Sequence, residues 1–332
     1  MPGSAYHRVA EKVAEWLSVV PECQINSSTK SVCDKLKTIV LAEDEIMISF
    51  DVTSLYTNVP VMESITVCTD LLFNLPVKYH PPVDRETFMK LATIASCDVV
   101  MSTHDGFFKQ VDGLAMGSPP APHLANGWLS QFENVIRDDA RIYDRYMDDI
   151  LRECKLTSVA PKLAEINSLH PNLQFTLERE ENNKLPYIGM QIIHDPETGH
   201  LSSTWYSKPT DTGLIMNYHS LAPKRYKRSV VSGFVHRLYQ CCSSWHNFHD
   251  SLTKAKRILE KISIHHHSTN LSLDKLLKQY GEKPHTRQSN LARLQRRKER
   301  LLLRRLCFAS SIGVNVPRIL PVPSTSVKHH VL

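Results

Sequence analysis

Apolar residues in the first part of the chain follow two spacings, one typical of helices and one of short buried strands. Within residues 4–40 they recur every three or four positions and predict helix, broken at Pro21: Val9, Val13, Trp16, Leu17 and Val20. The run IMISFD at 46–51 is short, apolar and rich in residues that favour strands. It predicts a buried strand that ends in the carboxylate of Asp51.

Helical and strand-like segments then alternate as far as Trp205. The pattern predicts helices at 60–72, 84–96 and 162–169. It predicts a hairpin at 99–111 and shorter strands at 145–151, 173–177 and 188–193, the first of them being two pieces joined by an acidic turn. A tight loop at 113–119 leads into a helix whose core face holds Leu124, Trp128, Phe132, Val135 and Ile136. This succession predicts an α+β domain.

The rest of the chain is mostly helix-like and basic. The pattern predicts helices at 223–242, 249–264 and 289–306, followed by a loose tail rich in proline and serine. Residues 1–200 carry 17 Lys and Arg against 28 Asp and Glu, whereas residues 201–332 carry 23 against 6. This division favours a protein that holds metal cations with one part and a polyanion with the other, although a solvated basic tail gives the same composition.

Targeting signals and disulfides are not indicated. No run of about 18 apolar residues exists, and the N-terminus lacks the basic-then-apolar order of a secretory signal. The eight cysteines are scattered, with no CxxC pair, which favours reduced thiols. We therefore expect an intracellular protein, nuclear or cytoplasmic, without a membrane partner.

Three aspartates are candidates for metal binding. Asp51 ends a predicted strand, and Asp148 and Asp149 occupy the tip of a predicted hairpin. Joining a nucleotide to a 3′-hydroxyl needs charge stabilisation at three oxygens, which two Mg²⁺ ions roughly 4 Å apart supply. Magnesium prefers oxygen ligands and usually takes one or two carboxylates. The alternative is an ordinary exposed acidic turn, which is our interpretation of Asp138-Asp139.

Several motifs strengthen the metal interpretation because they resemble a known family. Three of them resemble motifs A, B and C of reverse transcriptases, in that order: SFDVTSLYTNVP at 49–60, GLAMGSPPAP at 113–122 and YMDDI at 146–150. NNKLPYIGM at 182–190, followed by WYSKPTDT at 205–212, narrows the resemblance to the reverse transcriptases of Penelope-like retroelements. It covers roughly residues 2–265 and implies a right-hand polymerase palm, with an antiparallel sheet and packed helices, plus a helical thumb.

The resemblance also implies roles for particular residues. Asp51, Asp148 and Asp149 are the catalytic residues and, with the Val52 carbonyl, the ligands of two Mg²⁺ ions, for which Mn²⁺ can substitute. Tyr56 is the steric gate that excludes ribonucleotides, and its alternative is a core tyrosine beside Leu55. The loop supporting the nucleotide contains Gly113, Met116, Gly117 and Ser118. A compatible alternative is a helix-capping loop with Ser118 as N-cap and Pro119 as the first helical residue.

The basic residues of the rear part are candidates for nucleic-acid binding, since basic and aromatic residues alternate there. They are Lys208, Lys224, Arg225, Lys227, Arg228 and Arg237, and, within a segment at 287–305 with eight basic residues and one acidic residue, Arg296 and Arg297. In the family, part of this region has a helix-turn-helix-like character. The segment at 287–305 is also compatible with a nuclear-localisation patch or a solvated helix face.

The implied domains are a fingers remnant or helical entry at 1–45, the palm at 46–206, a basic, helix-turn-helix-like thumb at 207–306 and a loose tail at 307–332. The implied partners are an RNA template, a DNA primer and deoxynucleoside triphosphates. The fingers part that normally grips the triphosphate, and the GIY-YIG endonuclease usual in the family, are not recognised, so we expect a fragment whose activity is open. The alternative function is an inert relic that only binds nucleic acid.

Overall fold

The computed structural model describes residues 5–97, 100–138, 140–213, 215–217 and 219–261. The predicted helix at 289–306, Arg296, Arg297 and the tail lie outside the described residues. The chain divides into two compact units, one formed by residues up to Thr212 with Arg237–Thr253, the other by Gly213–His236 and residues from Lys254 onward. The boundaries of the four predicted domains stay predictions.

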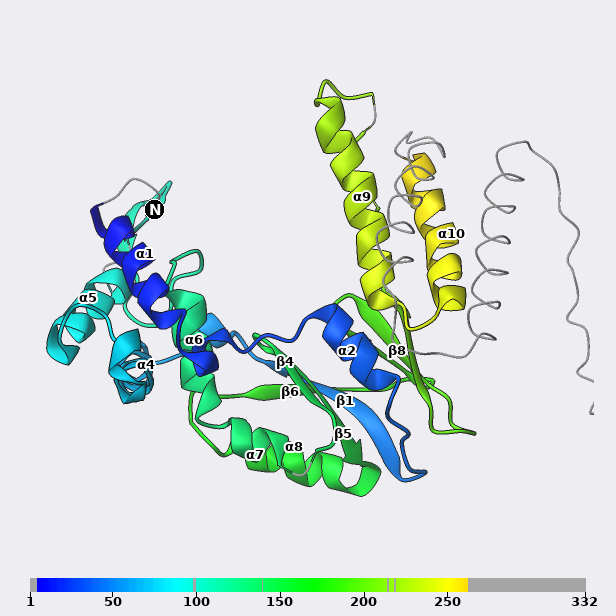
Figure 1. Cartoon of the computed structure of the whole chain (residues 1–332), viewed down its shortest axis with the longest axis horizontal. Coiled ribbons are helices and arrows are strands. Elements are labelled where there is room, and N and C mark those ends of the chain that lie inside the picture. Colours follow the sequence, from blue (N-terminus) through cyan, green and yellow to red (C-terminus); the bar gives the residue numbers. More distant parts are fainter. Residues whose placement is uncertain (1–4, 98–99, 139, 214, 218, 262–332) are drawn as a thin grey trace, which may run out of the picture. The chain divides into compact units, whose positions relative to one another are not determined.

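The central element of the first unit is a four-stranded antiparallel sheet with the order β4-β5-β1-β6 (Figure 1). Its strands are β1 (Glu45–Val52), β4 (Tyr143–Tyr146), β5 (Asp149–Lys155) and β6 (Phe175–Arg179). β1 pairs with β5 on one side and with β6 on the other. The predicted α+β class with an antiparallel sheet is confirmed, and β6 begins two residues later than expected.

The two faces of this sheet have different surroundings because successive side chains of a strand point to opposite sides. Ile48 and Phe50 of β1 and Ile150 of β5 are fully buried in the main hydrophobic core. Helices α7 (Glu133–Arg137) and α8 (Val159–Asn167) lie along this side of the sheet (Figure 1). Asp51 and Asp149 belong to the opposite face. The buried face therefore fixes where the acids project.

A second antiparallel sheet follows, with the order β7-β8-β9. Its strands are β7 (Lys184–Tyr187), β8 (Met190–His194) and β9 (Leu201–Trp205). The expectation of a strand at 188–193 is wrong at its start, because Ile188 and Gly189 have φ of 36° and 79° and form the turn between β7 and β8. The Tyr187 hydroxyl donates to the Asp144 carbonyl at 3.0 Å and so joins this sheet to β4.

The remaining helices of the first unit agree with the expected positions more closely than with the expected lengths. They are α1 (Ala5–Leu17), α2 (Thr29–Leu36), the short α3 (Leu55–Asn58), α4 (Val61–Asn74), α5 (Arg85–Cys97) and α6 (Ala121–Ser130), together with the 3₁₀ turns Pro21–Gln24, Val77–Tyr79 and Leu156–Ser158. The helix expected to carry both Leu124 and Ile136 is in fact two helices, α6 and α7, separated at Gln131 and Phe132. The predicted hairpin is present as β2 (Val100–Thr103) and β3 (Gly106–Lys109).

Two long helices, α9 (Lys224–Cys241) and α10 (Trp245–Lys261), occupy the predicted basic region. α9 passes from the second unit to the first after His236, and α10 passes back after Thr253. None of the described helices combines the length and hydrophobicity needed to cross a bilayer. No disulfide links the seven cysteines that the structure describes.

Gly127 on α6 provides a test of the packing that supports the sheet. A Cβ atom there would lie 2.9 Å from the Cys23 sulfur and closer still to the Cys68 sulfur, whereas a Cβ at Gly233 on α9 meets nothing within 4 Å. We expect Gly127→Ala to destabilise the protein by about 1–3 kcal/mol through overpacking. Gly233→Ala is expected to stabilise it by up to about 1 kcal/mol, since alanine favours helix.

Denaturant unfolding of the two variants measures this difference. Equal effects of the same sign would contradict the packing described for α6.

Candidate active site

The pairing of β1 with β5 brings together acids that lie far apart in the sequence. Asp51 stands directly opposite Asp149 in the register of the two strands. The Val52 amide donates to the Asp148 carbonyl at 3.2 Å, so the turn before β5 is also attached to β1. Asp51, Asp148 and Asp149 therefore gather at one end of the sheet, on the face that the main core leaves open.

Repulsion and burial shape the electrostatics of these acids. Burial, assisted by the negative charges of Asp148 and Asp51, raises the pKa of Asp149 to about 6. Burial and then Asp148 raise the pKa of Asp51, while the positive charge of Lys208 acts in the opposite direction on both groups. No hydrogen bond or ion pair within the described part of the chain engages the three carboxylate groups. Their negative charge is therefore poorly compensated by the protein.

A hard divalent cation fits this donor set. The available ligands are carboxylate oxygens, and Mg²⁺ typically binds one or two carboxylates while keeping water or phosphate oxygens in its remaining positions. Among the described residues, no three or more His, Cys, Asp or Glu side chains are already disposed around one point for a metal. The magnesium site therefore stays a prediction from the sequence and from the carboxylate donors.

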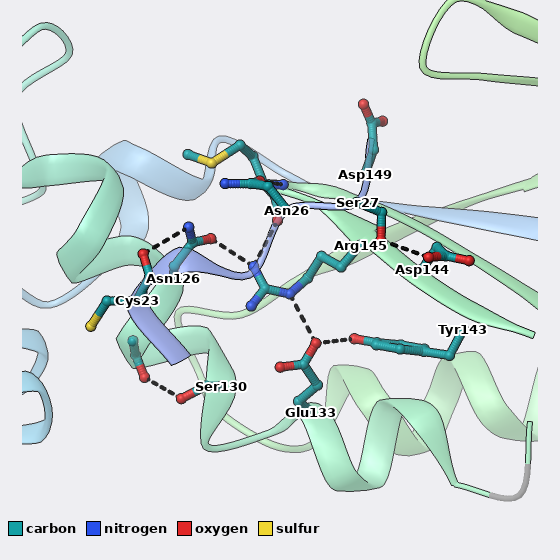
Figure 2. A network of polar contacts seen from close by, with 12 residues as sticks. Cys23, Asn26, Ser27, Asn126, Ser130, Glu133, Tyr143, Asp144, Arg145 and Asp149 are labelled. Atoms are coloured by element: carbon teal, nitrogen blue, oxygen red, sulfur yellow. Dashed lines mark hydrogen bonds and ion pairs between the residues drawn. The ribbon is translucent and has the colours of Figure 1, made fainter. Parts of the chain in front are cut away.

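The acidic turn is held by contacts that the sequence did not reveal (Figure 2). Met147 has φ of 56°, in the left-handed region that side chains disfavour. Its amide donates to Asn26 Oδ1 at 2.9 Å, and its carbonyl accepts from Arg145 Nη1 at 3.3 Å. The sequence analysis did not single out Arg145. The signal that could have identified it is a charged residue inside a buried strand, next to the acidic turn.

Tyr56 and the glycine-containing loop lie next to each other. The Leu114 amide donates to the Tyr56 carbonyl at 2.6 Å, and a Cβ on Gly113 would lie 2.6 Å from the Thr57 carbonyl oxygen. Gly113 has φ of 79° and so is suited to this close approach. Burial raises the pKa of Tyr56, and Asp148 and Tyr146 add to the shift, so its hydroxyl lies near the acidic turn. The side chain also packs on the core, which keeps both interpretations of Tyr56 open.

Of the other residues in the loop at 113–119, some are exposed and some make local contacts. Met116 is 76% exposed, and Gly117 has φ of 86° with open space around it. The capping interpretation of Ser118 and Pro119 is wrong, because α6 begins at Ala121 with Pro120 as its N-cap. The Ser118 hydroxyl instead donates to the Ala95 carbonyl at 3.5 Å.

The predicted basic residues fall into two groups. Lys208 lies close enough to the acids that its positive charge opposes the increase in pKa that burial causes at Asp51, Asp149 and Glu178. The residues on α9 are exposed or half-buried: Lys224, Arg225, Lys227, Arg228 and Arg237. Lys227 Nζ donates to the Ser220 carbonyl at 2.6 Å, and the Arg225 guanidinium lies 4.8 Å from the ring centroid of Tyr226.

Comparison with known proteins yields one family match. The model of the animal helix-turn-helix domain matches residues 214–263, which include α9 and α10. This match confirms the predicted helix-turn-helix-like character of that segment. A search of curated protein sequences finds no significant match.

Solved structures similar to this chain are polymerases. Telomerase from Candida albicans, in complex with the TWJ fragment of telomeric RNA, is 12% identical with a TM-score of 0.52, over 82% of this chain and 50% of that chain. Apo telomerase from Candida tropicalis is 11% identical with a TM-score of 0.46, over 82% and 51%. The Sicinivirus 3Dpol RNA-dependent RNA polymerase is 10% identical with a TM-score of 0.43, over 71% and 50%.

The first of these similarities carries the fold assignment. The chain has the right-hand polymerase palm fold, with antiparallel sheets, packed helices and a helical rear part, as predicted. It spans about half the length of the telomerase that it matches.

The raised pKa of Asp149 predicts how stability depends on pH. Folding shifts this pKa from 3.8 to about 6, so the ionised carboxylate disfavours the folded state. This loss of folding free energy is absent below about pH 4, where Asp149 is protonated in the folded and the unfolded state. It is fully present above about pH 6. We expect Asp149→Asn to raise the free energy of unfolding at pH 7.5 by about 1 kcal/mol, a value reduced for solvent screening of a half-exposed group, and to have little effect near pH 4.

Denaturant titrations at both pH values, without divalent cations, measure the effect. Asp44→Asn, at the opposite end of β1, is the control and should change stability by less than about 0.5 kcal/mol. A destabilising Asp149→Asn at pH 7.5 would contradict the electrostatic description.

Proposed function

We propose that this chain is the palm and thumb part of a reverse transcriptase of the Penelope-like retroelement type. The proposed reaction is RNA-directed DNA synthesis, in which a primer 3′-hydroxyl attacks a deoxynucleoside triphosphate and pyrophosphate leaves. The partners would be an RNA template and a DNA primer. The observation that carries the proposal is the register of β1 and β5, which sets Asp51 opposite Asp149 and beside Asp148.

The proposed mechanism assigns one task to each group of residues. Asp51, Asp148 and Asp149, with the Val52 carbonyl, would hold two Mg²⁺ ions, for which Mn²⁺ can substitute. When bound, the ions would supply charge stabilisation at the attacking oxygen, the leaving oxygen and the charged phosphate between them. Tyr56 would limit the space beneath the sugar, and the loop with Gly113, Met116, Gly117 and Ser118 would support the nucleotide. Lys208, near the acids, would bind a backbone phosphate of the primer.

The retroelement origin rests on the motifs rather than on the fold, since one fold can carry many functions. YMDDI comprises the last residue of β4, the turn and the first residues of β5, and SFDVTSLYTNVP covers the end of β1 and α3. In NNKLPYIGM, Tyr187 donates to the carbonyls of Asp144 and Asp149 at 3.0 and 3.3 Å. This contact gives the motif a physical reason to accompany the acidic turn.

Primer extension on an RNA template in Mg²⁺ tests the proposal directly. We expect DNA products from the wild-type chain and none above background from Asp51→Asn or Asp148→Asn, because each removes a proposed metal ligand. Asp44→Asn, just before the far end of β1, should extend the primer as well as the wild type does. Extension that survives both aspartate substitutions would refute the assignment of these ligands.

The gate role of Tyr56 predicts a change in sugar selection. Replacing Tyr56 by alanine should raise ribonucleotide incorporation, relative to deoxynucleotides, by about tenfold or more, because the clash with the 2′-hydroxyl is removed. Single-nucleotide incorporation kinetics with matched ribo- and deoxynucleotides measure the ratio. An unchanged ratio would favour the core-tyrosine interpretation.

A second candidate function is favoured by the helix-turn-helix match and by the exposed basic residues of α9. In this case the chain would bind nucleic acid without synthesising it. Each lost phosphate contact should reduce the slope of log K against log salt by about 1. We expect the double variant Arg225→Ala, Arg228→Ala to reduce that slope by about 1–2, while Lys90→Ala on α5 leaves it unchanged. Binding without primer extension would favour this function over the polymerase.

A further inference from the structure

The acidic turn contains a residue whose conformation needs support. Met147 immediately precedes Asp148 and has φ of 56°. A left-handed conformation costs a residue with a side chain roughly 1–2 kcal/mol relative to its preferred conformations, whereas glycine adopts it freely. A free turn would therefore tend to relax, and the direction of the Asp148 side chain would change with it.

Two side chains hold both peptide groups of Met147. Asn26 Oδ1 accepts from the Met147 amide at 2.9 Å. Arg145 Nη1 donates to the Met147 carbonyl at 3.3 Å. Each contact is specific to the observed direction of one peptide group, so together they favour the left-handed conformation over its alternatives. We call Asn26 and Arg145 the turn clamp.

Arg145 approaches the turn from the face of the sheet opposite the acids. Arg145 stands opposite Ile150 in the β4–β5 register and so shares its core-facing side. Its side chain is fully buried between α6 and α7, where Nη1 donates to Asn126 Oδ1 at 2.7 Å and Nε to Glu133 Oε1 at 3.2 Å (Figure 2). Figure 2 shows Asp149 pointing away from this guanidinium.

Asn26 belongs to a segment, residues 23–27, that is also connected to Arg145. Asn26 forms a β-bridge with Tyr146, and the Ser27 amide donates to the Arg145 carbonyl at 2.8 Å. The side-chain amide of Asn126, which accepts from Arg145 through Oδ1, also donates from Nδ2 to the Cys23 carbonyl at 3.4 Å. Residues 23–27 therefore reach the turn by two routes, one through Asn26 and one through Asn126 and Arg145.

A purely stabilising role explains this arrangement poorly. Burying an ion pair usually adds little net stability, because the desolvation of both charges offsets their attraction. The hydrogen bonds of a buried network nevertheless restrict the structure around it, although among the described residues Arg145 Nη2 is buried without a hydrogen-bond partner. Here the restricted element is the turn that carries Asp148.

We propose that Asn26 and Arg145 are positioning residues that hold Met147 in its left-handed conformation and thereby direct Asp148 toward Asp51 for metal binding. The inference rests on the proposed function, since it concerns the same metal site. It adds two residues, neither of them acidic, whose effect on the metal acts through the backbone of the turn.

Mn²⁺ affinity of the full chain, measured from the electron paramagnetic resonance signal of free Mn²⁺, tests the clamp without requiring polymerase activity. Asn26→Ala is the central variant because Asn26 is exposed and its loss threatens the fold little. We expect it to weaken Mn²⁺ binding about three- to tenfold, as the loss of one hydrogen bond implies. Arg145→Lys should weaken binding at least as much.

The route through Met147 is tested by a double-mutant cycle. In a Met147→Gly background the left-handed conformation needs no support, so Asn26→Ala should weaken binding less than about twofold. Arg152→Lys is the matched control: Arg152 is a buried arginine on β5 whose Nη1 donates to the Ile136 carbonyl at 2.6 Å, away from the turn. It should leave Mn²⁺ affinity unchanged.

Three outcomes would overturn the clamp: wild-type affinity in Asn26→Ala, an equal loss in the presence and absence of Met147→Gly, or an equal loss in Arg152→Lys. Failure of the proposed function would give a result that is distinct from these three. If the wild-type chain binds no Mn²⁺, or if Asp148→Ala binds it equally well, the metal site itself is refuted, and the positioning role with it.

Discussion

The structure depends on one costly juxtaposition, the pairing of two strands that each bring a carboxylate to the same end of the sheet. Asp51 and Asp149 oppose each other in register, and like charges in that position destabilise a sheet. The opposite faces of the same strands bury Ile48, Phe50 and Ile150 completely. Each such side chain contributes about 1.5–3 kcal/mol on burial, so the core can hold the acids in a position that they would not adopt alone. The proposed metal ions would compensate the charge of these acids.

The neighbouring elements restrict the same region from several sides. Tyr187 of the second sheet donates to backbone carbonyls on both strands of the acidic hairpin. Arg145 supports the turn from the core side, and Gly113 lets its loop lie close against the backbone of Thr57, the residue after Tyr56. Four separate sequence motifs therefore meet at one end of the sheet. A fold alone does not define a function, and these contacts at one site are what the proposed function is argued from.

The sequence predicted the central strands and the acidic hairpin because short apolar runs beside turn residues leave few alternatives. It failed for β7 and β9, whose patterns are weaker. β7 contains Pro186, and the middle buried position of β9 is Ser203, a polar residue that bonds to Cys33 and Ser243. The strand and hairpin pattern made the three acids candidates, and the resemblance gave them and Tyr56 their roles, since their types and spacing form a motif. Asn26, Asn126 and Glu133 carry no such signal, because their importance arises only from tertiary contacts with Arg145.

The central claim is that Asp51, Asp148 and Asp149 share divalent cations. Anomalous diffraction from crystals grown with Mn²⁺ would test it most directly, because the metal is located without reference to activity. The account predicts anomalous density within coordination distance of carboxylate oxygens from both Asp51 and the Asp148–Asp149 pair. Crystals saturated with Mn²⁺ that show no such density between these carboxylates would contradict it.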